Sequence, residues 1–155
     1  GGAHENERRA GTENLPAICG LVTATEQFVP NPVFRAETLE PFCKRMEDMW
    51  TSIPGCRLIS PRTGRLNNTV AAVVEAADSI TLLSNLDLEG ICASRGSACS
   101  SGSLEPSHVI SALNLPNNLS NSLVRFSVGR ATTEDDINRV AAVLPTVVQR
   151  STTSG

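Results

Sequence analysis

The stretch "SLVRFSVG", residues 122–129, carries the clearest fold signal in the chain because its side chains alternate in character. Val124, Phe126 and Val128 are apolar, and Arg125 lies between two of them. A period of two is typical of a β-strand with one buried face. The sequence therefore predicts a half-buried strand here, with Arg125 on the face opposite the apolar side chains.

Helices are predicted on both sides of this strand along the chain. In residues 132–150, Thr133 and Asp136 resemble a capping box at the start of a helix, and Pro145 is expected to kink that helix. Residues 106–113 predict a shorter helix whose first residue is a proline, which suits an initial helical turn.

The most regular helical pattern covers residues 35–53. Apolar side chains recur there at steps of three and four residues, which makes one apolar stripe. The members of the stripe are Leu39, Phe42, Cys43, Met46, Met49, Trp50 and Ile53. Glu40, Lys44 and Asp48 follow the opposite, polar side. We expect this helix to pack on the sheet through the stripe.

The remaining segments complete an α/β arrangement. Residues 56–60, 68–75 and 91–94 are predicted to be strands, with a turn at 61–64, and residues 78–90 a helix between Asp78 as N-cap and Gly90 as stop. Residues 1–14 are a polar loop, and residues 15–28 a short helix. The element order favours an α+β small domain whose helices cover one face of a small mixed or antiparallel sheet.

Composition excludes several classes of function. The chain has 155 residues, of which 40% are hydrophobic and 19% charged, and a net charge of -3. This acidic balance gives no electrostatic footprint for nucleic acid. No apolar run is long enough to span a membrane, and no signal peptide is recognisable. We therefore expect neither a nucleic acid nor a membrane as partner.

Five cysteines occur, and none is in a CxxC pair, so no zinc site is predicted. Their spacing also differs from a secreted disulfide framework, which favours a reducing, cytoplasmic location. Four of them have apolar neighbours and are expected to be buried, namely Cys19, Cys43, Cys56 and Cys92.

Cys99 is different, because it lies in the serine- and glycine-rich stretch "SRGSACSSGS", residues 94–103. An accessible thiol on such a loop is a candidate nucleophile, although a surface cysteine without a role has the same composition. Arg125 is a candidate carboxylate clamp, or an ordinary exposed strand arginine. His4 and His108 complete no catalytic triad, and the opening glycines are not followed by the Gly-Lys-Ser/Thr of a phosphate-binding loop.

Four stretches of the chain carry a family resemblance. They are "GGAHENERRAGTEN" (1–14), "RLNNTV" (65–70), "LLSNLDLEGICASRGSACSSGSLEPSHVISAL" (82–113) and "LVRFSVGRATTEDDIN" (123–138). Together they resemble successive motifs of the cysteine desulfurases of the NifS/IscS type, within the class V aminotransferase superfamily. The likeness runs from Gly1 to about Arg150 and is weakest between Val22 and Arg65.

The resemblance implies the C-terminal part of a fold-type I enzyme that uses pyridoxal 5'-phosphate (PLP). Residues 1–34 would end the large PLP domain, 35–150 would form the small domain with its cysteine loop at 94–104, and 151–155 a tail. In that family the loop cysteine, matched by Cys99, takes sulfur from L-cysteine as a persulfide, and alanine leaves.

Other residues and partners follow from the same resemblance. Arg125 matches the arginine that holds the substrate carboxylate, and Thr12 a threonine that contacts the PLP phosphate in the other subunit of a homodimer. His4 and Arg9 align with the opening motif without a firm role. The implied partners are L-cysteine, a second subunit, and an iron–sulfur scaffold or other sulfur acceptor. No resident metal is implied, although Cys99 could transiently touch an iron–sulfur cluster.

The chain departs from the family pattern at three places. Arg95 stands where a small polar residue is usual, which would lower the thiolate pKa of the loop cysteine or leave the arginine solvated. The glycine-bearing turn after the second strand is replaced by "VEAADS", residues 74–79. Lys44 is the only lysine, and its place on a polar helix face does not suit the Schiff base that holds PLP. The isolated chain is therefore expected to be inactive.

Three hypotheses remain open at this point. The preferred one makes the chain a piece of a desulfurase whose site is completed by residues that this sequence lacks. The second makes it a stand-alone, non-catalytic module that carries persulfide or docks on a scaffold. The third makes it an inactive remnant, in which Cys99 has no role.

Overall fold

A computed structural model describes residues 2, 4–32, 35–59, 65–95 and 108–152. The chain divides into two compact units, Gly1–Val33 and Phe34–Gly155.

The first unit holds a polar turn followed by α1 (Leu15–Phe28), the helix that the sequence predicts. Asn14 caps this helix, since its side chain accepts a hydrogen bond from the Ala17 amide at 3.1 Å. Pro16 lies in the first turn, where a missing N–H breaks no helical hydrogen bond. No residue of α1 is buried.

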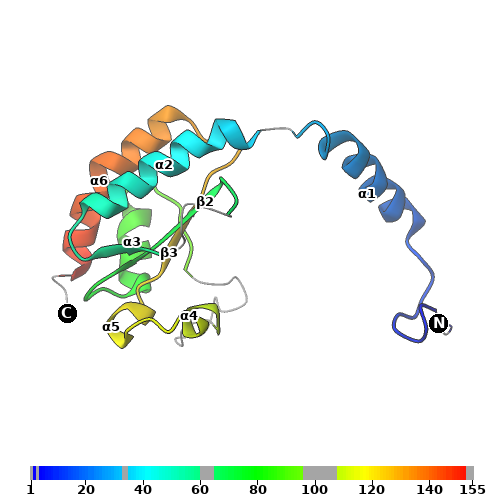
Figure 1. The fold of residues 1–155 in the computed structure, drawn as a ribbon, viewed down its shortest axis with the longest axis horizontal. Coiled ribbons are helices and arrows are strands. Elements are labelled where there is room, and N and C mark those ends of the chain that lie inside the picture. The colour runs from blue at the N-terminus through cyan, green and yellow to red at the C-terminus, as the bar shows by residue number, and fades with distance from the viewer. Residues whose placement is uncertain (1, 3, 33–34, 60–64, 96–107, 153–155) are drawn as a thin grey trace. The chain divides into compact units, whose positions relative to one another are not determined.

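The second unit builds a three-stranded sheet and five helices from its described residues (Figure 1). The strands are β1 (Cys56–Leu58), β2 (Thr69–Val74) and β3 (Val124–Ser127). The helices are α2 (Ala36–Ser52), α3 (Ser79–Leu88), α4 (His108–Ala112), α5 (Asn117–Ser120) and α6 (Glu134–Thr152).

The sheet is antiparallel throughout, in the order β1-β2-β3. β2 is the central strand, with Ala72 opposite both Leu58 of β1 and Val124 of β3, and Ala71 opposite Arg125. Helices α2, α3 and α6 cover one face of the sheet (Figure 1). This confirms the predicted α+β class, with helices on a small antiparallel sheet.

One apolar cluster lies between this sheet face and the three helices. It includes Val124 and Phe126 of β3, as the alternation of that strand predicts, and most of the α2 stripe. Trp50 of α2 is 1% exposed and its ring centroid lies 6.0 Å from that of Phe126. A tilted aromatic pair of this kind adds to the burial of both rings. The contact sets α2 against β3.

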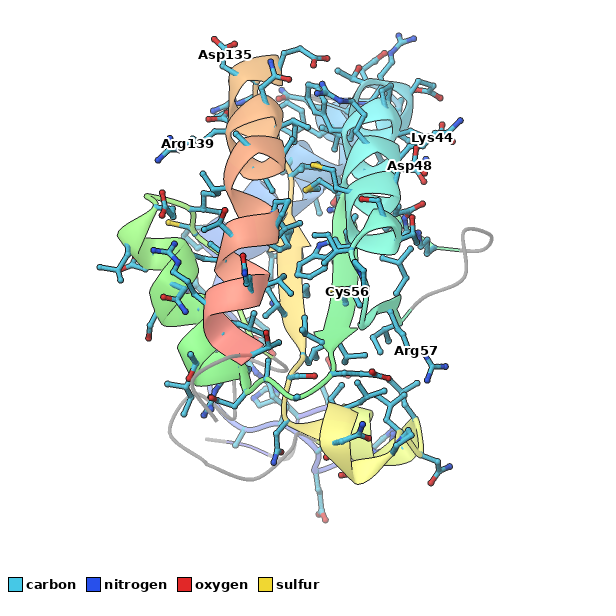
Figure 2. The ribbon with its side chains drawn as sticks, turned by 90° about the vertical axis from the view of Figure 1, so that its left-hand side faces the viewer. Lys44, Asp48, Cys56, Arg57, Asp135 and Arg139 are labelled. Carbon is cyan, nitrogen blue, oxygen red and sulfur yellow. The ribbon has the colours of Figure 1, made fainter. Side chains whose placement is uncertain are left out.

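The outer faces of the covering helices are charged. Lys44 and Asp48 of α2 and Asp135 and Arg139 of α6 all point away from the sheet (Figure 2). The two helices are amphipathic, and polar outer faces leave their apolar stripes free to pack inward. Lys44 is thus a surface lysine, as expected from its place on the polar side.

The helix ends follow the predicted capping chemistry. The Asp78 carboxylate accepts hydrogen bonds from the Ile80 and Thr81 amides at 2.8 and 3.1 Å, and α3 ends before Gly90, whose φ is +73°. Thr133 and Asp136 form the expected reciprocal box at the start of α6. Helix α6 then continues through Pro145 to Thr152.

The prediction of a strand at 91–94 is wrong except at its last residue. Only Ser94 pairs, as an isolated bridge to Arg125. Residues 91–93 diverge from β3 instead, and a cavity of ≈ 320 Å³ lies between them, the end of β3 and the start of α6. The short helix α5 was not predicted. The buried Ser122 hydroxyl, which bonds the Val74 amide and the Leu119 carbonyl, ties α5 to β2.

The predicted turn at 61–64 and the start of the helix predicted at 106–113 lie outside the described residues. The described part of that helix is α4.

The turn after β2 keeps a left-handed backbone without a glycine. Ala76 has a φ of +55°, in the region that costs a residue with a Cβ atom about 1–2 kcal/mol. It lies in "VEAADS", where the resembled family has its glycine-bearing turn. The conformation is therefore maintained by its surroundings, which include the Glu75 amide bonded to the Gly55 carbonyl at 2.9 Å.

Replacement of this alanine by glycine should stabilise the protein. We expect Ala76→Gly to raise the free energy of unfolding by about 1 kcal/mol, because glycine removes the left-handed strain at a smaller cost in unfolded-chain entropy. Urea denaturation followed by circular dichroism measures the change. Ala142→Gly, on the exposed side of α6, is the matched control and should lower stability by about 1 kcal/mol. A loss of stability in both variants would show that Ala76 is unstrained.

Candidate active site

Arg125 lies on β3 with its side chain directed away from the principal core. Its strand neighbours Val124 and Phe126 are buried on the helix-covered face, so the pleat places Arg125 on the other face. The side chain is partly buried there. This is the position that the alternation of "SLVRFSVG" predicts.

The guanidinium of Arg125 contains a buried donor. Its Nε atom is buried and has no hydrogen-bond partner in the part of the chain that the structure describes. A buried unpaired donor costs about 1–3 kcal/mol. An arginine fork of Nε and a terminal nitrogen matches the two oxygens of a carboxylate, so the site suits an anionic ligand of that shape.

The backbone of Arg125 is bonded to the residue at which the serine-rich stretch begins. The Ser94 amide donates to the Arg125 carbonyl at 3.0 Å, and the Arg125 amide donates to the Ser94 carbonyl at 2.7 Å. Cys99 itself lies outside the described residues. The pairing nevertheless fixes the start of the segment that carries Cys99 beside the strand that carries Arg125. The sequence analysis singles out Cys99 and Arg125, but it does not predict the pairing of Ser94 with Arg125.

Arg95 follows this bridge and is partly buried. The pKa of Asp78 is held below its usual range by the hydrogen bond from the Thr81 side chain, and further by the Thr81 and Ile80 amides and, to the smallest extent, by the charge of Arg95.

The other residues singled out at the chain start lie in the first unit. Thr12 is exposed and precedes the Asn14 cap of α1. His4 Nδ1 lies 3.6 Å from a carboxylate oxygen of Glu13, and an Arg9 terminal nitrogen donates to the Gly11 carbonyl at 3.1 Å. These contacts arrange the turn locally.

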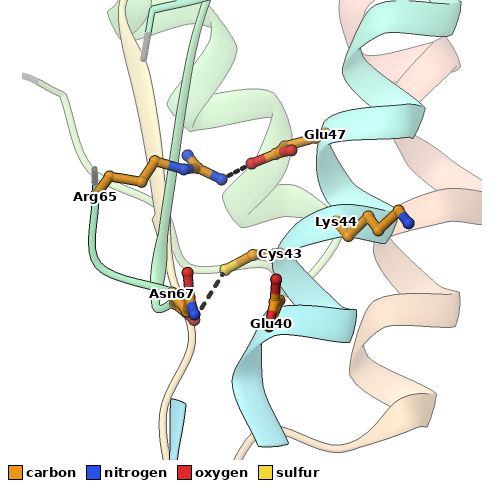
Figure 3. A pocket seen from close by; sticks show the side chains of 6 residues that line it. All are labelled: Glu40, Cys43, Lys44, Glu47, Arg65 and Asn67. Atoms are coloured by element: carbon orange, nitrogen blue, oxygen red, sulfur yellow. Dashed lines mark hydrogen bonds and ion pairs between the residues drawn. The ribbon is translucent and has the colours of Figure 1, made fainter. Parts of the chain in front are cut away.

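A small polar pocket of ≈ 190 Å³ lies beside α2 (Figure 3). Glu47, whose side chain is 4% exposed, forms an ion pair with Arg65 there. The Cys43 thiol donates to the Asn67 carbonyl at 3.5 Å. Glu47 occupies a position on the apolar stripe of α2, next to Met46, so the sequence does contain a signal for a buried acid. The ion pair with Arg65 offsets part of the cost of burying this acid.

Lys44 borders this pocket but points away from Cys43 and Arg65 (Figure 3). Its side chain is exposed, in agreement with the predicted surface position. A lysine that forms an imine is typically buried among apolar groups, and Lys44 lacks such surroundings.

The expectation that four cysteines are buried is wrong for two of them. Cys43 is buried and Cys56 partly buried, but Cys19 and Cys92 are exposed. Cys19 is on α1, which buries nothing within its unit. Cys92 follows the buried Ile91 in the segment that diverges from β3. Its exposed side chain borders the open cavity beside that segment.

The described residues contain no group of three His, Cys, Asp or Glu side chains placed to bind a metal ion. Among the helices that the structure describes, none has the length and apolar character needed to cross a membrane.

A family model described as "Aminotransferase class-V" matches residues 3–140. The chain belongs to this family.

Curated members of the family resemble the chain over nearly its whole length. It is 42% identical to "Cysteine desulfurase IscS" of Methanosarcina thermophila over 150 residues, and 42% identical to "Cysteine desulfurase" of a Nostoc strain over 155 residues. Each match covers 97% of this chain but only 37% and 38% of the two relatives. The chain thus spans less than two fifths of the length of these relatives.

Solved structures show the same fold. A NifS-like protein from Rickettsia africae superimposes on this chain with a TM-score of 0.76 at 25% identity. The match covers 96% of this chain and 39% of that protein. A second NifS-like protein gives a TM-score of 0.74 at 23% identity. The resemblance to cysteine desulfurases that the motifs carry is therefore confirmed, and so is the fold class.

The cysteines should differ sharply in reactivity. Burial raises the pKa of the Cys56 thiol from 9.0 to about 11, which lowers its thiolate fraction near neutral pH about a hundred-fold. Burial also raises the pKa of Cys43, and the Arg65 charge only partly opposes this. We expect iodoacetamide at about pH 8 to modify Cys19 and Cys92 well before Cys43 and Cys56.

Peptide mapping by mass spectrometry follows each cysteine separately in this experiment. In denaturant the four should react at similar rates, which is the control for local sequence effects. Equal rates for Cys56 and Cys92 in the folded protein would contradict the burial pattern.

Proposed function

We propose that the chain is part of a PLP-dependent cysteine desulfurase, which converts L-cysteine to L-alanine and holds the sulfur as a persulfide on Cys99. The observation that carries this proposal is the double backbone bond between Ser94 and Arg125. This pairing places the start of the segment that contains Cys99 beside Arg125, whose Nε atom is buried and has no partner among the described residues. Similarity to curated cysteine desulfurases supports the same reaction.

The proposal assigns no covalent link between the cofactor and this chain, because Lys44 is exposed on the outer side of α2. The PLP lysine is proposed to come from residues of the protein outside this sequence, in a large domain that residues 1–34 would complete. Bound PLP would supply the electron sink for the reaction. Thr12, which is exposed, is proposed to contact the cofactor phosphate in the second subunit of a homodimer.

Within the proposed reaction, Arg125 binds the α-carboxylate of L-cysteine through two parallel hydrogen bonds. The Cys99 thiolate attacks the substrate sulfur. A sulfur–sulfur bond forms as the carbon–sulfur bond breaks, and its electron pair stays on the substrate carbon, which takes up a proton to give alanine. Cys99 then carries one additional sulfur atom at the oxidation level of a persulfide.

The persulfide is proposed to pass to an iron–sulfur scaffold or another acceptor protein in the cytoplasm. A segment rooted at one end on β3, and rich in glycine and serine, has the composition needed to reach both a substrate and an outside acceptor. A transient contact of Cys99 with a nascent cluster is compatible with this transfer.

The proposal is tested in the protein that contains this chain together with its PLP lysine. Cys99→Ser should reduce formation of alanine and sulfide from L-cysteine to background, since serine does not accept sulfur. Cys92→Ser, seven residues earlier and exposed, is the matched control and should retain activity. Full activity of Cys99→Ser would contradict the proposed nucleophile.

Arg125 should affect substrate binding more than the chemical step. Arg125→Lys keeps the charge but loses the fork, and we expect KM for L-cysteine to rise about 10- to 100-fold, the equivalent of one charge-assisted hydrogen bond. Steady-state kinetics separates KM from kcat. A carboxylate clamp is excluded if KM is unchanged in a variant that folds normally.

A separate experiment distinguishes the carrier hypothesis. The chain alone is mixed with an independent cysteine desulfurase and L-cysteine, and mass spectrometry detects any sulfur added to Cys99. Sulfur uptake here, together with no alanine formation by the complete protein, would favour a persulfide carrier over an enzyme.

A further inference from the structure

We propose that Ala71 of β2 is a specificity-determining residue, whose small side chain leaves the Arg125 guanidinium accessible to a small carboxylate. The identity of that carboxylate as L-cysteine rests on the proposed function, but access to Arg125 is testable without it. Arg125 supplies the donors, and Ala71 determines how large a group can lie beside them.

The register of the sheet brings the two residues together. Ala71 and Arg125 lie directly opposite each other on neighbouring strands. The Arg125 amide and carbonyl both bond to Ser94, on the far side of β3. The Ala71 carbonyl accepts from the Ile59 amide at 3.0 Å, on the far side of β2. Ala71 and Arg125 therefore form a non-hydrogen-bonded pair, in which Cα atoms are about 4.5 Å apart and the side chains come closest.

Both cross-strand neighbours of Arg125 are small. Ser94 pairs with Arg125 from the other edge of β3, so the two side chains lie on the same face of the sheet. Ala71 and Ser94 are much shorter than an arginine and leave space beside its guanidinium. All three side chains are partly exposed, so this space borders solvent.

The cover on this face of the sheet ends before Ala71. Val73, two residues further along β2 and on the same face, is 0% exposed. Helix α5 packs against β2 at that end, where the Ser122 hydroxyl bonds the last amide of the strand at 3.0 Å. Ala71 is only partly buried. A longer side chain at position 71 can therefore fill the space beside Arg125 without entering the core.

The buried Nε atom of Arg125, which has no partner among the described residues, makes position 71 a sensitive place for a test. Glutamate has as many bonds between Cβ and its carboxylate oxygens as arginine has between Cβ and Nε. Ala71→Glu therefore brings a carboxylate to the height of Nε on the neighbouring strand, where it supplies an acceptor. Ala71→Gln has the same shape without the charge.

Thermal unfolding of the 155-residue chain, followed by circular dichroism, measures the first effect. We expect Ala71→Glu to unfold about 2–4 °C above Ala71→Gln, the shift that one partly exposed charge pair gives in a chain of this size. Adding Arg125→Gln to both variants should abolish the difference. Equal melting temperatures of the two single variants would overturn the placement of position 71 beside the guanidinium.

Acetate is the probe for access, because it is a carboxylate with one methyl group. In the wild-type chain, sodium acetate should shift the ¹⁵N NMR signal of Arg125 Nε–H in a saturable way, and sodium chloride at the same concentration should not. Ala71→Glu and Ala71→Gln should each weaken this response at least about tenfold, because their side chains occupy the same space. Ala71→Ser, which is close to alanine in size, should retain it.

Ala142→Glu, on the exposed side of α6, is the matched control for the added charge and should leave the response to acetate unchanged. The absence of a saturable shift in the wild type would overturn the proposal. A response that survives intact in Ala71→Gln would overturn it as well.

Kinetics of the protein that contains this chain and its PLP lysine separate this proposal from the proposed function. Ala71→Gln should raise KM for L-cysteine at least about tenfold with little change in kcat, whereas Ala71→Ser should leave both nearly unchanged. An active desulfurase whose KM is unaffected by Ala71→Gln would contradict the role of Ala71 alone. If the acetate results hold but the complete protein forms no alanine from L-cysteine, the role of Ala71 stands and the proposed function fails.

Discussion

The strict alternation of β3 is the constraint on which fold and site both depend. Its apolar side chains must enter the space below α2 and α6, where Phe126 meets Trp50. Because successive side chains of a strand point to opposite faces, Arg125 lies on the face away from the helices. A shift of the strand by one residue would bury the guanidinium in the core and expose two large apolar side chains. Core packing therefore fixes the register of β3, and with it the face of the sheet on which Arg125 lies.

Sequence patterns were sufficient wherever one local rule acted alone. The α2 stripe, the Asp78 cap and the Thr133–Asp136 box each depend on residues within a few positions of one another, and all are present. The failures depend on distant partners. Residues 91–94 have the composition of a buried strand, but a cavity bordered by the end of β3 and the start of α6 lies beside Ile91 and Cys92, and only Ser94 pairs with β3. The same divergence exposes Cys92, which its apolar neighbours had suggested was buried.

Partners that are remote in sequence also determine whether a polar side chain can be buried without a large energetic cost. Glu47 on an apolar stripe would be destabilising alone, and the ion pair with Arg65, from a different segment of the chain, offsets part of the cost of its burial. Nothing in the local sequence around either residue specifies this pairing. Arg125 presents the contrasting case, because its Nε atom is buried and the described chain supplies no acceptor for it. The first arrangement pairs two described residues, whereas the second leaves a donor that a ligand could use.

The contrast between Arg125 and Lys44 indicates which parts of a class-V active site this chain could supply. A donor left unpaired costs about 1–3 kcal/mol, a substantial share of the stability of a folded domain. A carboxylate ligand would offset that cost, and the Ser94 bridge places the start of the segment that contains Cys99 next to the Arg125 backbone. Lys44, by contrast, is solvated and turned outward from its nearest pocket. The described residues therefore include an arginine suited to a carboxylate, whereas Lys44 lacks the buried, apolar surroundings of an imine-forming lysine. Such a division is consistent with an active site assembled from more than one segment of a class-V protein.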